Sequence, residues 1–262
     1  MPAWIQRWRQ QRTLRRRPIP EPSWQLTLAR FPFLTRRSEG DLLELRNMAT
    51  LFLAQKEFAG MRGLEVTDEM AVAIAAQACL PALKLGLDWL DGFVGVVVHE
   101  DAVVARREVE DEDGIVHAFD EELAGEAMQG GPVMLAWRDV DEAGESAAEG
   151  YNVVVHEFAH VIDMRGGLTA GLDDVDPQSR RGIWLGSLAD EFERFARQVD
   201  RNRPTFLDPY AAESLEEFFA VAAEAFFVAP LDLARHQKRV YPLLRDAFRQ
   251  DPAATWRPDA TA

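Results

Sequence analysis

The chain has 262 residues, of which 47% are hydrophobic and 28% are charged. We therefore expect one large or two small domains with a packed core, and the composition excludes wholesale disorder. A formal net charge of -15 excludes a general nucleic-acid-binding protein, because such binding needs Lys and Arg to neutralise phosphates. The single cysteine, Cys79, excludes an internal disulfide and a CxxC metal knuckle.

The apolar runs of the chain bear on its compartment. The longest two, Ala71–Leu83 and Phe218–Leu231, are interrupted by polar residues or proline and are too short to span a membrane. The first residues do not form the apolar segment of a secretory signal. Together with the single cysteine, these features lead us to expect a cytoplasmic protein without a membrane span.

Residues 1–22 are expected to form a basic arm rich in proline and arginine. Residues 1–20 contain six arginines and no acid. Because the whole chain has a net charge of -15, the remaining residues carry a net charge of -21. The arm is either flexible and lies on its own acidic body, or it contacts an acidic partner or a membrane surface. Trp4 and Trp8 would form an apolar edge for such a contact. Three prolines between residues 18 and 22 are expected to stop any helix there.

Two helices are predicted before the middle of the chain. Apolar residues recur with helical spacing over Leu42–Phe58, and glycines follow. Thr67 is a predicted N-cap, because acids that suit a first turn come directly after it. The helix that Thr67 opens is expected to run through Ala71–Leu80 and to break at Pro81.

The middle of the chain has short runs rich in β-branched residues, which indicate strands. The runs Phe93–Val98, Ala102–Ala105 and Pro132–Trp137 predict a small sheet of three or four strands. The acidic stretches Glu108–Asp113 and Asp120–Glu122 are interpreted as solvated loop. Proline is tolerated at a sheet edge, and extended peptides often add to an exposed edge strand. We therefore expect Pro132–Trp137 to line a substrate cleft.

The last part of the chain is predicted to be mainly helical, with a long surface loop at Arg165–Gly182. Its predicted helices are Asn152–Met164, Trp184–Gln198, Ser214–Phe227 and Arg235–Arg249. The sequence thus predicts an α+β fold, mainly helical with a small mixed sheet. Because no clear linker separates two cores, we expect a single domain over residues 23–252, followed by a flexible tail over residues 253–262.

Residues 156–160 read His-Glu-Phe-Ala-His. Residues i and i+4 lie on one helix face, so His156 and His160 can direct imidazole nitrogens to one ion. Glu157 lies about 100° further around the helix, where it can act as a general base beside a metal-bound water. The alternative is a helix with two structural histidines and a surface glutamate. Two of only five histidines occur in this motif.

Catalytic zinc sites usually have three protein ligands, so a third is needed. His236 lies among basic neighbours and is discounted, and His99 and His117 are interpreted as surface or turn histidines. A carboxylate from a later helix is expected instead. The segment 207–227 offers four glutamates, of which spacing along the apolar stripe ranks Glu217 first and Glu224 second. Spacing alone leaves the choice open.

Three segments together resemble the Mlc titration factor A family of bacterial zinc metallopeptidases: GPVMLAWRDV, YNVVVHEFAHVIDM and LDPYAAESLEEFFAVAAEAFF. The resemblance covers most of residues 25–252. It implies a zincin-like domain of the gluzincin type, similar to the anthrax lethal factor protease domain. It also implies that Zn²⁺ is bound by His156, His160 and Glu217, that Glu157 is the base, and that the hydroxyl of Tyr210 supports the transition state.

The resemblance also implies two functions. The first is aminopeptidase-like hydrolysis of short peptides. The second is regulatory, because titration factor A binds the transcriptional repressor Mlc in control of the glucose phosphotransferase system. A non-catalytic protein that sequesters a repressor is the alternative to the enzyme. Asp163 and Glu224 could orient ligands; equally, Asp163 could be an exposed helix-end residue and Glu224 a buried partner of an arginine.

Overall fold

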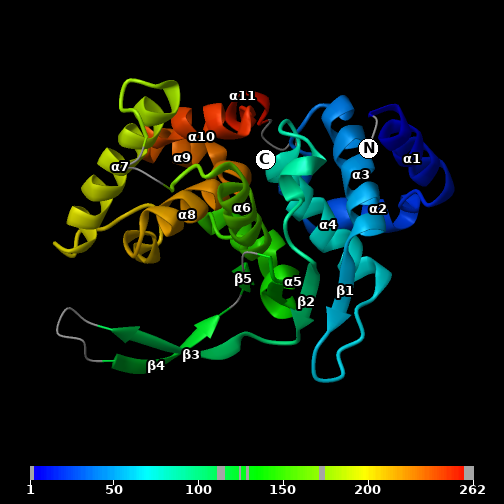
Figure 1. Ribbon diagram of the computed structural model, residues 1–262, viewed down its shortest axis with the longest axis horizontal. Helices are drawn as coiled ribbons and strands as arrows, with labels where there is room; N and C mark the ends of the chain where they lie inside the picture. The colour runs from blue at the N-terminus through cyan, green and yellow to red at the C-terminus, as the bar shows by residue number, and fades with distance from the viewer. Residues whose placement is uncertain (1–2, 111–115, 124, 128–129, 171–174, 257–262) are drawn as a thin grey trace, which may run out of the picture.

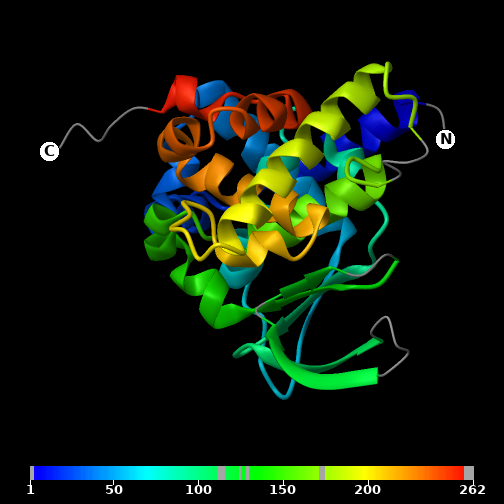
Figure 2. The same cartoon turned by 90° about the vertical axis from the view of Figure 1, so that its left-hand side faces the viewer.

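The computed structural model describes residues 3–110, 116–123, 125–127, 130–170 and 175–256. Helices make up most of this part, and most of them gather on one side of the strands (Figures 1 and 2). The architecture confirms the predicted α+β fold. Within the described residues, no helix combines the length and apolar character needed to cross a bilayer.

The main sheet has four strands in the order β1-β2-β6-β5. Strands β1 (Glu57–Gly60), β2 (Gly95–His99) and β6 (Val133–Ala136) are parallel, and β5 (Gly125–Ala127) pairs antiparallel to β6. The sheet is therefore small and mixed, as predicted. The prediction that Pro132–Trp137 forms an edge was wrong, because β6 pairs on both sides and β5 is the edge strand next to it.

A second, two-stranded sheet projects from the body as a hairpin (Figure 1). Strand β3 (Val103–Glu110) pairs antiparallel with β4 (Val116–Leu123). The interpretation of Glu108–Asp113 and Asp120–Glu122 as loop was therefore wrong for residues 108–110 and 120–122; residues 111–113 lie outside the described part. The physical reason is that ladder pairing satisfies the backbone groups of a hairpin even where the sequence is acidic.

The N-terminal part consists of helices separated by short turns. They are α1 (Ala3–Arg16), α2 (Glu21–Arg30), η1 (Pro32–Thr35), α3 (Glu39–Gln55), α4 (Asp68–Ala82) and η2 (Leu87–Leu90). Helix α1 lies against α3. The prolines separate α1 from α2 as expected, but Pro22 lies within the first turn of α2, where a missing N–H costs nothing.

Two predicted boundaries in this part are corrected. Helix α3 ends at Gln55, and Phe58 lies in β1 rather than in the helix. Pro81 does not break α4, which continues to Ala82, because a proline near the C-terminal end of a helix disturbs only the last turn. The N-cap prediction is confirmed: the hydroxyl of Thr67 accepts the Met70 N–H at 3.2 Å.

The C-terminal part holds the remaining helices. They are α5 (Trp137–Ser146), η3 (Ala147–Glu149), α6 (Val153–Gly166), α7 (Arg180–Val199), η4 (Pro209–Ala212), α8 (Leu215–Val228), α9 (Pro230–His236), α10 (Val240–Phe248) and α11 (Pro252–Thr255). Predicted helix Arg235–Arg249 is in fact two helices, and Trp137, predicted as the end of a strand, starts α5. The predicted loop Arg165–Gly182 begins and ends inside helices; its residues 171–174 are outside the described part.

Helix α6 runs through the centre of the molecule and contacts both α4 and α8 (Figure 1). Its buried face carries Phe158, whose ring centroid lies 5.7 Å from that of Phe52 and 5.5 Å from that of Phe93. All three rings are almost entirely excluded from solvent, which fixes the rotation of α6 about its axis. The face of α6 that meets α8 is thereby fixed as well.

Candidate metal centre

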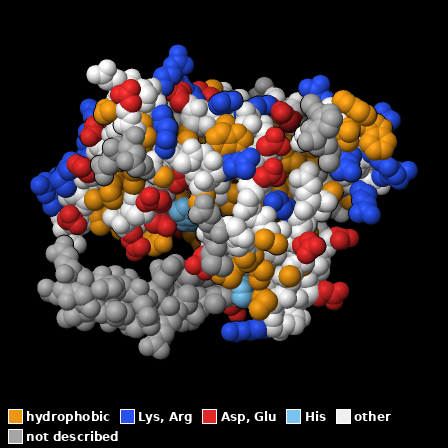
Figure 3. Space-filling view, in the orientation of Figure 1, with side chains coloured by type: hydrophobic (Ala, Val, Ile, Leu, Met, Phe, Trp, Pro, Cys, Tyr) orange, Lys and Arg blue, Asp and Glu red, His pale blue; other side chains and the backbone are white. Residues whose placement is uncertain are grey.

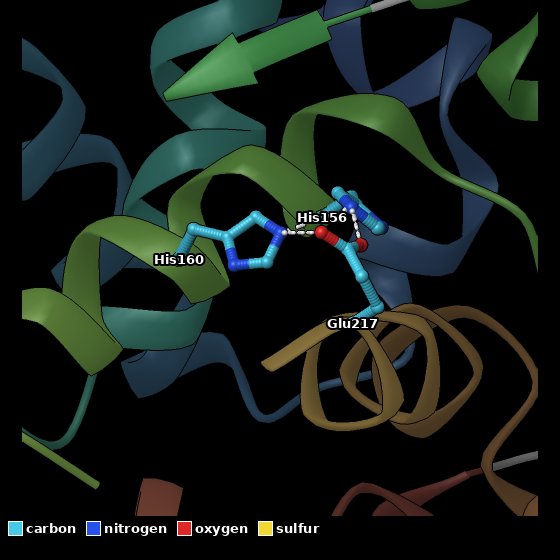
Figure 4. Close-up of side chains that lie close together, drawn as sticks. All are labelled: His156, His160 and Glu217. Carbon is cyan, nitrogen blue, oxygen red and sulfur yellow. Dashed lines mark hydrogen bonds and ion pairs between the residues drawn. The ribbon is translucent and has the colours of Figure 1, made fainter. Parts of the chain in front are cut away.

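Helix α6 presents two histidines from consecutive turns. Asn152 caps this helix, with its side-chain oxygen accepting the Val155 N–H at 2.8 Å. His156 and His160 follow on one face, and their ring centroids are 4.8 Å apart. Their Nε2 atoms lie 3.2 Å from one another, so both nitrogens converge on one point (Figure 4).

Glu217 reaches the same point from α8. It lies in the first turn of that helix, where the Ser214 hydroxyl accepts its backbone N–H at 3.1 Å. Its Oε2 is 3.1 Å from Nε2 of His156, and its Oε1 is 3.4 Å from Nε2 of His160 (Figure 4). Glu213 and Glu216, which the sequence also offered, do not belong to this cluster. Within the described part of the chain, this is the one group of metal-ligand type found.

The spacing of the three donors fits a small tetrahedral cation. Ligands held about 2.0–2.1 Å from zinc in a tetrahedron lie about 3.3–3.4 Å from one another. The distances of 3.1, 3.2 and 3.4 Å found here are close to that value. Two imidazoles with one carboxylate are also a donor set that zinc takes in catalytic sites. The residues therefore fit the metal ion.

A buried chain of hydrogen bonds holds His156 in place. Its Nδ1–H donates to Oε1 of Glu224 at 2.8 Å, which leaves Nε2 free as a ligand atom. Oε2 of Glu224 accepts the Asn152 backbone N–H at 2.5 Å. The Asn152 side-chain amide donates in turn to Oε1 of Gln77 on α4 at 2.8 Å. All three partners are almost entirely buried, so the chain is shielded from water.

Gln77 and Asn152 are not among the candidate site residues that the sequence predicts. A signal for Gln77 existed, because this polar residue interrupts an otherwise apolar helix and a buried amide requires partners. The sequence leaves Glu224 as either an orienting residue or a partner of an arginine; in the structure its contact is with His156. Asp163 contacts neither histidine; its carboxylate accepts the backbone N–H and the hydroxyl of Thr169, which ties the end of α6 to the following loop.

The histidines and carboxylates of the cluster shift one another's pKa values toward the charged forms. Burial alone would lower the pKa of His156, but the Glu224 and Glu217 carboxylates raise it well above its usual range. Burial alone would raise the pKa of Glu217, but hydrogen bonds from His156 and His160 hold it well below its usual range. Glu217 therefore carries the negative charge that a cation site requires.

Glu157 lies beside the ligands but points toward the sheet. Only 4% of its surface is exposed, and burial raises its pKa to about 7, against the opposing effect of His156 and His160. Gly125 of β5 contacts it so closely that a Cβ at this position would lie 2.5 Å from Oε1 of Glu157. A glycine in the edge strand is therefore what makes room for this carboxyl.

Tyr210 completes the predicted set of site residues, and the discounted histidines His99 and His236 lie elsewhere. The ring of Tyr210 lies in η4, with its centroid 6.3 Å from that of His156. The Tyr210 backbone N–H donates to Asp208 at 2.8 Å, which fixes this turn. His99 lies in β2 and His236 stacks on Phe206 at 5.0 Å, so neither joins the cluster.

Sequence comparison assigns the chain to a protein family. The chain matches the glucose-regulated metallo-peptidase M90 family over residues 5–249. The match covers nearly all of the chain, and the chain therefore belongs to this family. Membership implies a metal ion, and the cluster of two histidines and one glutamate is the place in the described structure that can hold it.

Individual relatives are similar to this chain over most of its length. The chain is 35% identical to Mlc titration factor A of Klebsiella pneumoniae over 239 residues, which cover 90% of this chain and 89% of the relative. It is 32% identical to Mlc titration factor A of Escherichia coli over 247 residues, 94% of this chain and 91% of the relative. An uncharacterised protein of Synechocystis is 34% identical over 253 residues, covering 96% and 91%.

Proposed function

We propose that this protein is a zinc-dependent peptidase, with residues 23–252 as its single catalytic domain. The observation that carries the proposal is the convergence of His156, His160 and Glu217 at distances of 3.1–3.4 Å, beside a buried carboxyl whose pKa of about 7 suits a general base at neutral pH. Membership of a metallo-peptidase family supports it.

The residues have distinct roles in the proposed reaction. His156, His160 and Glu217 would hold Zn²⁺, which supplies a Lewis acid for the scissile carbonyl and the attacking water. Glu157 accepts the proton of that water and passes it to the leaving amine. The Tyr210 hydroxyl donates to the oxyanion as negative charge develops there. Glu224 keeps His156 oriented throughout. Short peptides are the proposed substrates, cleaved in the manner of an aminopeptidase.

Metal analysis and peptide hydrolysis test this proposal together. We expect about one zinc per chain in the wild type and in Glu157→Gln, and a loss of hydrolysis of at least about 100-fold in Glu157→Gln. Tyr210→Phe should keep its zinc and lose about 100-fold in kcat. Bound zinc without hydrolysis of any peptide would refute the peptidase. Equal zinc content in wild type and Glu217→Ala would refute the ligand set.

A regulatory role is a second candidate, supported by the name Mlc titration factor A that relatives carry. The partner would be a DNA-binding repressor, whose basic surface suits a chain of net charge -15. The arginine-rich α1 would serve a different, acidic contact: Arg and hydrophobic side chains gather over it (Figure 3), and Trp4 and Trp8 are 71% and 55% exposed.

Co-purification with the repressor tests this role. We expect the wild type and Glu157→Gln to bind it equally, because binding needs no hydrolysis. Removal of residues 1–20 shows whether the basic arm contributes. The absence of binding by the full-length chain, at micromolar concentration and low salt, would refute the regulatory role.

A further inference from the structure

A cavity of about 360 Å³ lies beside the metal centre, between the segment 146–151 that precedes α6, the middle of α8 and the segment 205–209. One wall is Glu224, the residue that holds His156. Another is Pro209, which directly precedes Tyr210. The cavity is therefore lined by one residue of the proposed machinery, Glu224, and by the chain neighbour of another, Tyr210, while none of the three ligands lines it. Its volume is at the lower end for small-molecule sites, which suits one side chain rather than a folded partner.

The lining combines an apolar wall with an acidic rim. Leu207 and Val221 are buried and provide apolar surface. Glu149 and Asp208 are exposed and stand at the opening. Of the residues that line this cavity, none is Lys, Arg or His. Both oxygens of Glu224 are already engaged, by His156 and Asn152, so the carboxylates available to a ligand are those at the rim.

Tyr151, which directly precedes the N-cap of α6, indicates the sign of the electrostatic potential in the cavity. Its ring also lines the cavity. Burial raises the pKa of its hydroxyl, and the carboxylates of Asp139, Glu224, Glu157 and Asp208 raise it further. Each of these carboxylates disfavours a second negative charge at this place. The same field favours a positive one.

We propose that this cavity receives a lysine or arginine side chain of the peptide substrate, next to the bond that is cleaved. Such side chains have an aliphatic stem that packs on apolar surface and a charged head that remains in a polar setting, which matches the wall formed by Leu207 and Val221 and the rim formed by Glu149 and Asp208. The proposal rests on the proposed peptidase function and assigns it a substrate class: short peptides with a basic residue.

Peptides that differ only at one position test the pocket. They carry lysine, arginine, norleucine or glutamate on either side of the scissile bond. Norleucine retains the stem and lacks the charge, so the ratio of kcat/KM for lysine over norleucine isolates the rim. We expect a ratio of at least about 10 in the wild type. We expect a drop of about 5-fold or more in Glu149→Gln and Asp208→Asn, with the norleucine peptide unchanged. Asparagine keeps the oxygen that accepts the Tyr210 N–H.

Glu145→Gln is the matched control, because this residue is an exposed acid of α5 that does not line the cavity. Its ratio should equal that of the wild type. A wild-type ratio near one, or an equal loss for lysine and norleucine peptides in the rim variants, would overturn the proposal.

A binding measurement separates this proposal from the peptidase itself. Fluorescence anisotropy of a labelled lysine peptide on zinc-loaded Glu157→Gln reports the pocket without turnover. Weaker binding when Glu149→Gln is added, with the norleucine peptide unaffected, supports the pocket even if the wild type hydrolyses nothing. Equal binding of lysine and norleucine peptides overturns the pocket even if hydrolysis is observed.

Discussion

Glu224→Gln replaces one carboxylate oxygen with an NH₂ group in the buried hydrogen-bond chain that holds His156. Glutamate at this position accepts two N–H groups, from His156 Nδ1 and from the Asn152 backbone, at 2.8 and 2.5 Å. Glutamine has one oxygen and one NH₂ group. Whichever way the amide turns, its NH₂ faces one of the two N–H donors. One of the two hydrogen bonds is therefore lost, while the volume of the side chain stays the same.

The size of the effect follows from that count. A buried N–H left without a partner costs about 1–3 kcal/mol. Loss of the partner of a metal-bound histidine typically weakens metal binding by about 10- to 100-fold, which corresponds to about 1.4–2.7 kcal/mol. The two ranges agree, so we expect the zinc Kd of Glu224→Gln to rise by about one to two orders of magnitude.

The assay is zinc competition against a fluorescent chelator at pH 7.5, with circular dichroism to show that the variant is folded. Glu216→Gln serves as the control, because Glu216 is an exposed acid on the same helix and should leave the Kd unchanged. A Kd for Glu224→Gln within about twofold of the wild type would refute the role of Glu224. An equal rise in the zinc Kd of Glu216→Gln would refute it as well, because the loss of any negative charge on α8 would then explain the effect.

Three further predictions concern the surroundings of the site. Because burial raises the pKa of Glu157 to about 7, the folded metal-free protein holds a proton that the unfolded chain releases near pH 4.5; its stability should fall as pH rises from 5 to 8, by at most about 3 kcal/mol. In urea unfolding with a chelator present, the free energy of unfolding of Glu157→Gln should rise relative to that of the wild type over this pH range. Parallel pH dependences of the two free energies would contradict this. Gly125→Ala places a Cβ 2.5 Å from Oε1 of Glu157 and should cost about 1–3 kcal/mol. Gly186→Ala is the control: the added Cβ meets open space and should stabilise α7 by about 0.5–1 kcal/mol. An equal change in stability for Gly125→Ala and Gly186→Ala would argue against the close contact between Gly125 and Glu157. Gln77→Leu leaves the Asn152 amide without its partner and should cost about 1–3 kcal/mol in the same urea assay; a neutral result would show that the amide finds another acceptor.

The sequence by itself determined the features that depend on neighbours along the chain. Two histidines four residues apart on a helix must share one face, and the cap at Thr67, predicted from the acids that follow it, is a local hydrogen bond to the next turn. The α+β class followed from the change in hydrophobic period between the middle and the rest of the chain. None of these features needs knowledge of which elements meet.

Only the tertiary structure decided what depends on how elements cross. Glu217 and Glu224 lie two turns apart on one stripe of α8, so spacing could rank them but not separate their roles. The packing of α8 on α6 brings Glu217 to the Nε2 atoms of both histidines and Glu224 to Nδ1 of His156. The same holds for β5, a three-residue strand too short to give a pattern, which becomes the sheet edge beside Glu157 through pairing with β6. Long-range pairing of this kind leaves almost no local signal, because the partners are distant in sequence and each alone is compatible with other neighbours.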